Sequence, residues 1–91
     1  MQQRSVSIHI TGTVQGVFFR HNTQMRADEL GVKGFVRNEP DGSVFIAAEG
    51  EASHVKLFIE WCKRGPEAAV VEGVEVRDAD FAGYSSFDVR R

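Results

Sequence analysis

The stretch VQGVFFR, residues 14–20, combines residue types that bind small anions. Gly16 can adopt backbone dihedrals that are closed to other residues, and it lets the backbone approach a ligand closely. Arg20 ends the stretch with a planar guanidinium whose N–H groups match the oxygens of a phosphate or a carboxylate. The stretch lacks the Gly-x-x-x-x-Gly-Lys-Ser/Thr pattern, which excludes a nucleotide P-loop. By itself it predicts either an anion site or a plain connection that carries an exposed arginine.

Asn38 is the second residue with useful chemistry. It ends the segment GFVRN and precedes the turn-like EPDG, residues 39–42. An asparagine in this place can simply form the turn through hydrogen bonds of its own side chain. Its amide oxygen can also accept a hydrogen bond from a water molecule and hold that water in place.

Arg20 lies between a predicted strand and a predicted helix. Apolar and polar residues alternate over 5–11, which predicts a strand with one buried face that Gly12 ends. Residues 21–31 predict a helix that begins next to Arg20 and is capped by Gly31. The N-terminus of a helix carries unpaired N–H groups and a partial positive charge. The loop, the helix start and the guanidinium would therefore face an anion together.

The rest of the chain predicts a hairpin, a second helix and two further strands. Their order with the first two elements, β-α-β-β-α-β plus a short extra C-terminal strand, is typical of the ferredoxin-like α+β fold. This fold is an α/β sandwich in which a mostly antiparallel sheet carries two helices on one face. The additional elements span residues 33–38, 43–50, 52–64, 69–80 and 84–91.

The length predicts a single domain over residues 1–91.

In a β-α-β unit the two strands run parallel, so the loop after the first strand and the end of the second lie at one edge of the sheet. We therefore expect Arg20 and Asn38 to converge.

Composition narrows the function classes. The net charge of −2 argues against general nucleic-acid binding, which depends on an excess of Lys and Arg. The first acidic residue is Asp28, so the segment before it offers an anion only positive side chains. No apolar run is long enough for a transmembrane helix, and we expect neither secretion nor membrane insertion. The single cysteine, Cys62, and the lack of zinc-site spacing predict a cytoplasmic chain without metal. A monomer is the default for a chain of this size.

Two longer patterns contain these residues, and both resemble signatures of the acylphosphatase family. The pattern G-x-V-Q-G-V-x-[F/M]-R matches residues 12–20 at every fixed position. The pattern G-[F/Y/W]-[A/V/C]-x-N-x3-G-x-V-x5-G matches residues 34–50 in the same way. Two spaced signatures are far more specific than one glycine-containing loop, and the resemblance covers nearly the whole chain.

The resemblance implies an enzyme that hydrolyses small-molecule acyl phosphates to a carboxylate and inorganic phosphate, without a cofactor. It assigns the binding of the phosphoryl group to Arg20 and to the loop amides, and the positioning of the attacking water to Asn38. Thr23 would support this arrangement. The amides belong to Gln15, Gly16, Val17, Phe18, Phe19 and Arg20.

Two departures from the family pattern are mild. Phe35 stands where tryptophan is common, which should leave the chemistry untouched. Glu39 follows Asn38 where a neutral residue often stands, and a carboxylate there would repel the substrate phosphate and raise KM. Of the two adjacent phenylalanines, we expect Phe19 to be the more buried and to anchor the loop. We expect His21 to point away from Arg20, because successive helical side chains diverge by about 100°.

Two other functions fit the same fold class. A regulatory domain would bind an anion without turnover, and tight phosphate binding without hydrolysis would reveal it. An RNA-binding module shares the element order, but the aromatic signature that begins at Lys33 breaks off at Arg37 and Asn38. Salt-sensitive binding of RNA would support that alternative.

Overall fold

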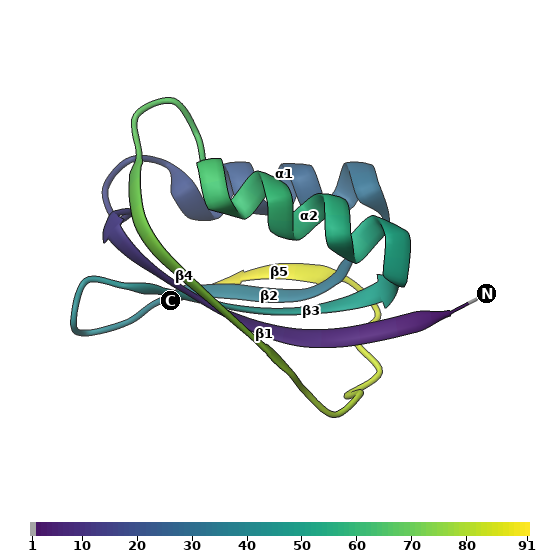
Figure 1. Ribbon diagram of the computed structural model, residues 1–91. Helices are drawn as coiled ribbons and strands as arrows, with labels where there is room; N and C mark the ends of the chain where they lie inside the picture. The colour runs from purple at the N-terminus through teal and green to yellow at the C-terminus, as the bar shows by residue number, and fades with distance from the viewer. Residues whose placement is uncertain (1) are drawn as a thin grey trace.

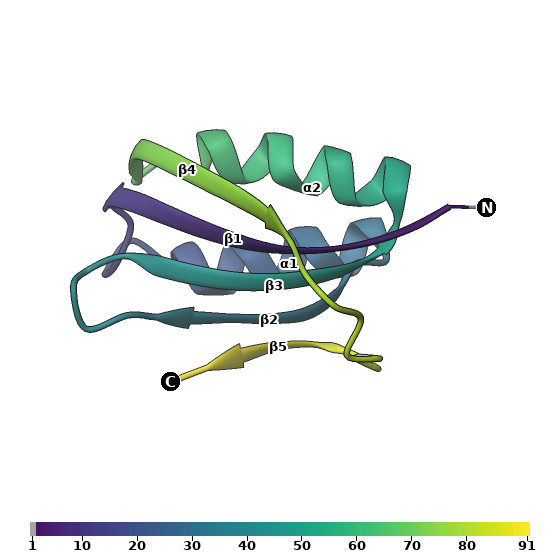
Figure 2. The ribbon, with the colours of Figure 1, turned by 60° about the horizontal axis from the view of Figure 1, so that its bottom comes forward.

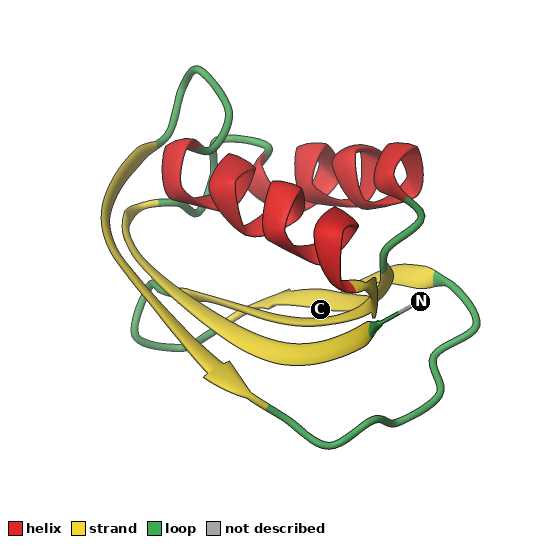
Figure 3. Cartoon of the chain, turned by 45° about the vertical axis from the view of Figure 1, so that its right-hand side comes forward, coloured by secondary structure: helices red, strands yellow, loops and turns green. Residues whose placement is uncertain are grey.

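The computed structural model describes residues 2–91, which form two helices and one five-stranded sheet (Figure 1). Both helices lie on one face of the sheet (Figure 3). The ferredoxin-like class and the extra C-terminal strand are therefore confirmed. The elements are β1 (Gln3–Thr13), α1 (Phe19–Leu30), β2 (Lys33–Asn38), β3 (Val44–Glu51), α2 (Ala52–Arg64), β4 (Val70–Asp78) and β5 (Phe87–Arg90).

The strand order in the sheet is β4-β1-β3-β2-β5. β1 and β2 both pair antiparallel with β3, so they run parallel to each other. Figure 2 shows that β1, β2 and β5 end at the same edge of the sheet. The β1–α1 loop therefore lies at the edge where β2 ends.

The core lies between the sheet and the helices. The alternation of β1 buries Val6, Ile8 and Ile10 almost completely against the helices. α2 contributes one apolar stripe at helical spacing, and all four of its members are buried: Val55, Phe58, Ile59 and Cys62. The fully buried residues of α1 are Phe19, Thr23 and Ala27. They are four residues apart and therefore lie on one face of the helix.

The end of β1 differs from the prediction. Gly12 does not end the strand, because β1 continues to Thr13 with a shift of register against β4 between Thr11 and Gly12. Gly12 has a φ of 127°, and a Cβ there would lie 2.1 Å from the carbonyl oxygen of Val70. This is a β-bulge in which only glycine fits, and it lets β4 follow β1 up to the loop.

None of the helices within residues 2–91 is both long and apolar enough to cross a membrane.

Candidate active site

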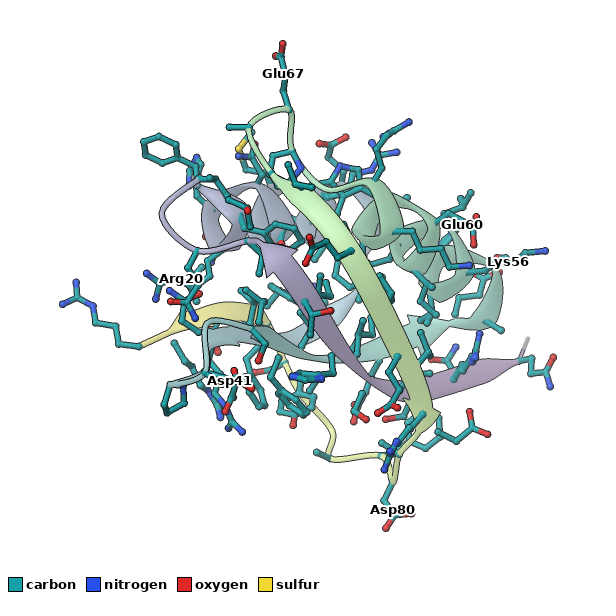
Figure 4. The ribbon with its side chains drawn as sticks, turned by 60° about the vertical axis from the view of Figure 1, so that its left-hand side comes forward. Arg20, Asp41, Lys56, Glu60, Glu67 and Asp80 are labelled. Atoms are coloured by element: carbon teal, nitrogen blue, oxygen red, sulfur yellow. The ribbon has the colours of Figure 1, made fainter. Side chains whose placement is uncertain are left out.

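A cavity of about 490 Å³ lies where the β1–α1 loop meets the end of β2. It brings Arg20 and Asn38 together with the loop that precedes α1. Figure 4 shows Arg20 on the same side of the molecule as Asp41 of the β2–β3 turn, away from Lys56 and Glu60 of α2. The lining residues are Val14, Gln15, Gly16, Phe18, Phe19, Arg20, His21, Gln24, Asn38 and Val89.

Several backbone N–H groups of the β1–α1 loop have no hydrogen-bond partner among residues 2–91. Gly16 and Phe18 both have left-handed backbone conformations, with φ of 74° and 60°. No hydrogen bond within residues 2–91 uses the backbone N–H groups of residues 15–18. The first N–H groups of α1, at Phe19 and Arg20, have no helical partner by construction. The loop and the helix start thus form a concave set of donors that suits an anion.

The backbone of the last strand, β5, holds part of the Arg20 guanidinium in place. Its Nη1 donates a hydrogen bond of 3.1 Å to the carbonyl oxygen of Arg90. None of the salt bridges within residues 2–91 includes Arg20. Its charge is therefore not neutralised by a carboxylate of the described chain, and the other N–H groups can serve a ligand.

Asn38 reaches the cavity from the end of β2. Its Oδ1 is buried and accepts no hydrogen bond from residues 2–91. A buried acceptor without a partner is costly. A half turn of the amide exchanges Oδ1 and Nδ2, so either atom can face the cavity.

Gln15 and Thr23 fix the loop from its two ends. The Gln15 Nε2 donates to the carbonyl oxygens of Glu39 and Ser43, at 2.8 and 2.9 Å. This joins the loop to the turn that follows Asn38. Thr23 is buried, does not line the cavity, and its Oγ1 donates to the carbonyl oxygen of Phe19 at 2.7 Å.

The two phenylalanines have opposite environments. Phe19 is 2% exposed and packs its ring on Trp61, with the centroids 5.8 Å apart. Phe18 is 77% exposed. The expectation that Phe19 anchors the loop in the core is confirmed, and Val17 adds a partly buried contact.

Glu39 does not line the cavity, and its carboxylate is paired with Arg37, whose Nε lies 2.6 Å from its Oε1. His21 is exposed as expected, yet it also lines the cavity, which the 100° argument did not predict. Gln24 and Val89 line the cavity too, and nothing in their residue types or spacing marked them.

The turn beyond Asn38 carries a perturbed carboxyl group. The Ser43 hydroxyl and backbone N–H both donate to Asp41, which holds the pKa of that carboxyl below its usual value. These bonds fix the turn to which Gln15 attaches. Within the described residues, no group of three or more His, Cys, Asp or Glu side chains could hold a metal ion.

Comparison with known proteins agrees with this geometry. A family model described as Acylphosphatase matches residues 6–89. An acylphosphatase of a Nocardioides species is 50% identical over 86 residues, covering 94% of this chain and 87% of that protein. The crystal structure of the acylphosphatase from Bacillus subtilis is 33% identical to this chain in sequence, with a TM-score of 0.93. The match covers 99% of this chain and 100% of that one.

A longer protein also contains a similar part. The crystal structure of full-length HypF, in its phosphate- and nucleotide-bound form, matches 99% of this chain with a TM-score of 0.88 and 29% identity. The match covers only 12% of the HypF chain. Since the family model spans most of the sequence and separate relatives match it over nearly their full lengths, the chain belongs to the acylphosphatase family.

Proposed function

We propose that this acylphosphatase hydrolyses the carboxyl–phosphate bond of small acyl phosphates by direct attack of water on the phosphorus. One observation carries the proposal: Arg20, Asn38 and the unpaired loop N–H groups surround one cavity. Arg20 and the backbone N–H groups of residues 15–20 hold the phosphoryl oxygens. Asn38 holds the attacking water.

Charge stabilisation comes from groups that are in place before the substrate arrives. The Arg90 carbonyl fixes one branch of the Arg20 guanidinium, while Phe19 in the core fixes the loop. Preorganised donors of this kind lower the barrier because they need not reorient during the reaction. Thr23 supports them by holding the carbonyl of Phe19.

The chemistry requires little else. The new bond joins the water oxygen to phosphorus, and the bond between phosphorus and the acyl oxygen breaks. The leaving group is a carboxylate, whose conjugate acid has a pKa of about 4, so it departs without a proton donor. A phosphoryl transition state is loose, so the water needs little deprotonation before it attacks. Positioning and charge are therefore sufficient, and we expect no metal or cofactor to be needed.

We expect the protein to act as a single-domain monomer in the cytoplasm, without nucleic-acid or membrane partners. An RNA-binding module would use the ring of Phe35 for base stacking. Here the residue is only 6% exposed, and the centroid of its ring lies 3.8 Å from the guanidinium carbon of Arg90. That cover supports the absence of a nucleic-acid partner.

The likeness to a part of HypF favours one alternative. A domain of this fold occurs inside a much longer protein, where it could bind an anion without turnover. The measurement that separates the two functions is hydrolysis of benzoyl phosphate with EDTA present, by the wild type and by Asn38→Ala. Calorimetry with inorganic phosphate completes the comparison.

We expect fast, EDTA-resistant hydrolysis by the wild type. Asn38→Ala should lose at least about a hundredfold in kcat, as for loss of a group that positions a reactant, and keep its phosphate affinity. Equal, near-background rates for both proteins would contradict the enzymatic function. Parallel loss of phosphate binding in Asn38→Ala would instead make Asn38 a ligand or a structural residue.

A further inference from the structure

Two side chains of α1 hold the last strand at two points. The Arg20 Nη1 donates to the carbonyl oxygen of Arg90 at 3.1 Å, and the Gln24 Nε2 donates to the carbonyl oxygen of Phe87 at 2.9 Å. Residues four apart on a helix lie on the same face, so one face of α1 binds both ends of β5.

β5 needs such support because it is a short edge strand. It has four residues and pairs only with β2 among the described strands. The chain reaches it by a loop that runs from one edge of the sheet to the other (Figures 2 and 3). Phe87 anchors its start, since the ring is buried against Phe58 with the centroids 5.7 Å apart. Gln24 binds the carbonyl of that same anchoring residue.

The register of β5 connects the two proposed catalytic residues. Its parallel pairing with β2 runs from Gly34 opposite Phe87 to Arg37 opposite Arg90. Asn38 is the next residue along β2. The carbonyl that holds Arg20 thus belongs to the residue paired beside Asn38. A shift of β5 would move Arg20 relative to Asn38.

We propose that Gln24 is a positioning residue for the reaction: by fixing β5 through Phe87, it holds the Arg90 carbonyl where it orients the Arg20 guanidinium. Gln24 also lines the cavity, as does Val89 of β5. The inference rests on the proposed role of Arg20 in phosphoryl binding. The hydrogen bond between Gln24 and Phe87 then supports the active site as well as the fold.

The test is a double-mutant cycle between positions 24 and 20, measured as kcat/KM for benzoyl phosphate. Gln24→Met keeps the length and neutrality of the side chain and removes the donor. Arg20→Lys keeps the charge and removes the planar fork. Gln3→Met makes the same substitution at an exposed position of β1 and serves as the matched control. Circular dichroism and thermal melting verify that each variant is folded.

Alone, Gln24→Met should lower kcat/KM about tenfold, within the range that double-mutant cycles find for coupled residues, and Gln3→Met should change it less than twofold. In the Arg20→Lys background, Gln24→Met should cost less than twofold, because the group it positions is already gone. Equal tenfold losses in both backgrounds, or no loss in either, would overturn the proposal.

A failure of the proposed function would look different. If the wild type does not hydrolyse benzoyl phosphate, the same four proteins of the cycle are titrated with inorganic phosphate in a calorimeter. Affinity then replaces kcat/KM. Coupling between positions 24 and 20 in phosphate affinity supports the positioning role even without turnover, and additive or absent effects overturn it.

Discussion

Arg20 is the one residue among Lys, Arg, Asp and Glu that lines the cavity. In the proposed mechanism its guanidinium meets a phosphoryl group whose negative charge is spread over several oxygens in the transition state. Arg20→Ala should therefore lower kcat/KM by about 10²–10³-fold or more, as for loss of a charged transition-state donor. The measurement is steady-state hydrolysis of benzoyl phosphate. Arg77→Ala is the control, because Arg77 lies on β4, pairs with Glu75 and does not line the cavity.

An Arg20 variant that keeps more than half of the wild-type kcat/KM would remove Arg20 from the mechanism. Loss of activity in Arg77→Ala as well would point instead to the long-range field of the whole chain. The two outcomes separate contact from field, since only Arg20 reaches the cavity.

At the residue scale, the sequence predicted which side chains meet at the cavity better than which side chains hold the loop and β5 beside it. The convergence of Arg20 and Asn38 could be predicted, because the two strands of a β-α-β unit run parallel and bring the loop and the end of β2 together. The side-chain bonds of Gln15 and Gln24 could not be predicted, because a glutamine side chain that binds a backbone carbonyl leaves no pattern in the sequence. Their partners, Ser43 and Phe87, lie 28 and 63 residues further along the chain.

β2 carries Asn38, and its first half depends on Gly34. This residue has a φ of 146°, which side chains rarely tolerate, and a Cβ would lie 1.9 Å from the carbonyl oxygen of Ala47 on β3. Gly34→Ala must push β2 away from β3. We expect a loss of about 2–4 kcal/mol in the free energy of unfolding, measured by urea denaturation, from the backbone strain and the clash together.

Gly50→Ala is the matched control for this element. Gly50 lies on β3, has no positive φ, and its Cβ would find its nearest neighbour at an ordinary 3.5 Å. Gly50→Ala should lower the free energy of unfolding by less than about 1 kcal/mol. Equal losses for the two variants would mean that methyl volume, and not the backbone of β2, decides stability. Gly34→Ala should also lower kcat, because Asn38 moves with its strand.

The elements themselves were predicted well where local patterns determine them. β2 occupies the predicted residues 33–38, and α1 ends at the predicted cap, Gly31, with a φ of 68°. The prediction failed at the end of β1, where Gly12 continues the strand through a bulge. The cause is the pairing with β4, where Gly12 lies opposite Val71, so no local pattern could indicate it.

At the scale of the molecule, the two faces of the sheet are covered by different means. The helices cover one face, while arginine side chains cover aromatic rings on the other. Arg90 stacks over Phe35 at 3.8 Å, and Arg37 stacks over Phe45 at 4.7 Å. Such stacking buries apolar rings under charges that stay in water. Phe35, the departure from the family's common tryptophan, lies under this cover and does not line the cavity.

Cys62 reports on the packing between the helices and the sheet, because it is the one cysteine of the chain and is fully buried. Burial in apolar surroundings raises the pKa of its thiol above the usual value, since desolvation penalises the thiolate. A thiol reagent should therefore label the folded protein at least about a thousandfold more slowly than the urea-unfolded chain, for a stability of about 5 kcal/mol or more.

The same thiol sets a pH dependence. Above about pH 8.5 the unfolded thiol loses its proton while the folded thiol keeps it. The folded state then binds more protons, so the contribution of Cys62 to stability is complete below that pH and is lost as pH rises. Urea denaturation from pH 7 to 10 should show this fall in the wild type and a smaller one in Cys62→Ala. Labelling at the unfolded rate without urea would mean that the α2 stripe does not exclude solvent. The core would then not give the β1–α1 loop the rigid support that the proposed preorganised N–H groups require.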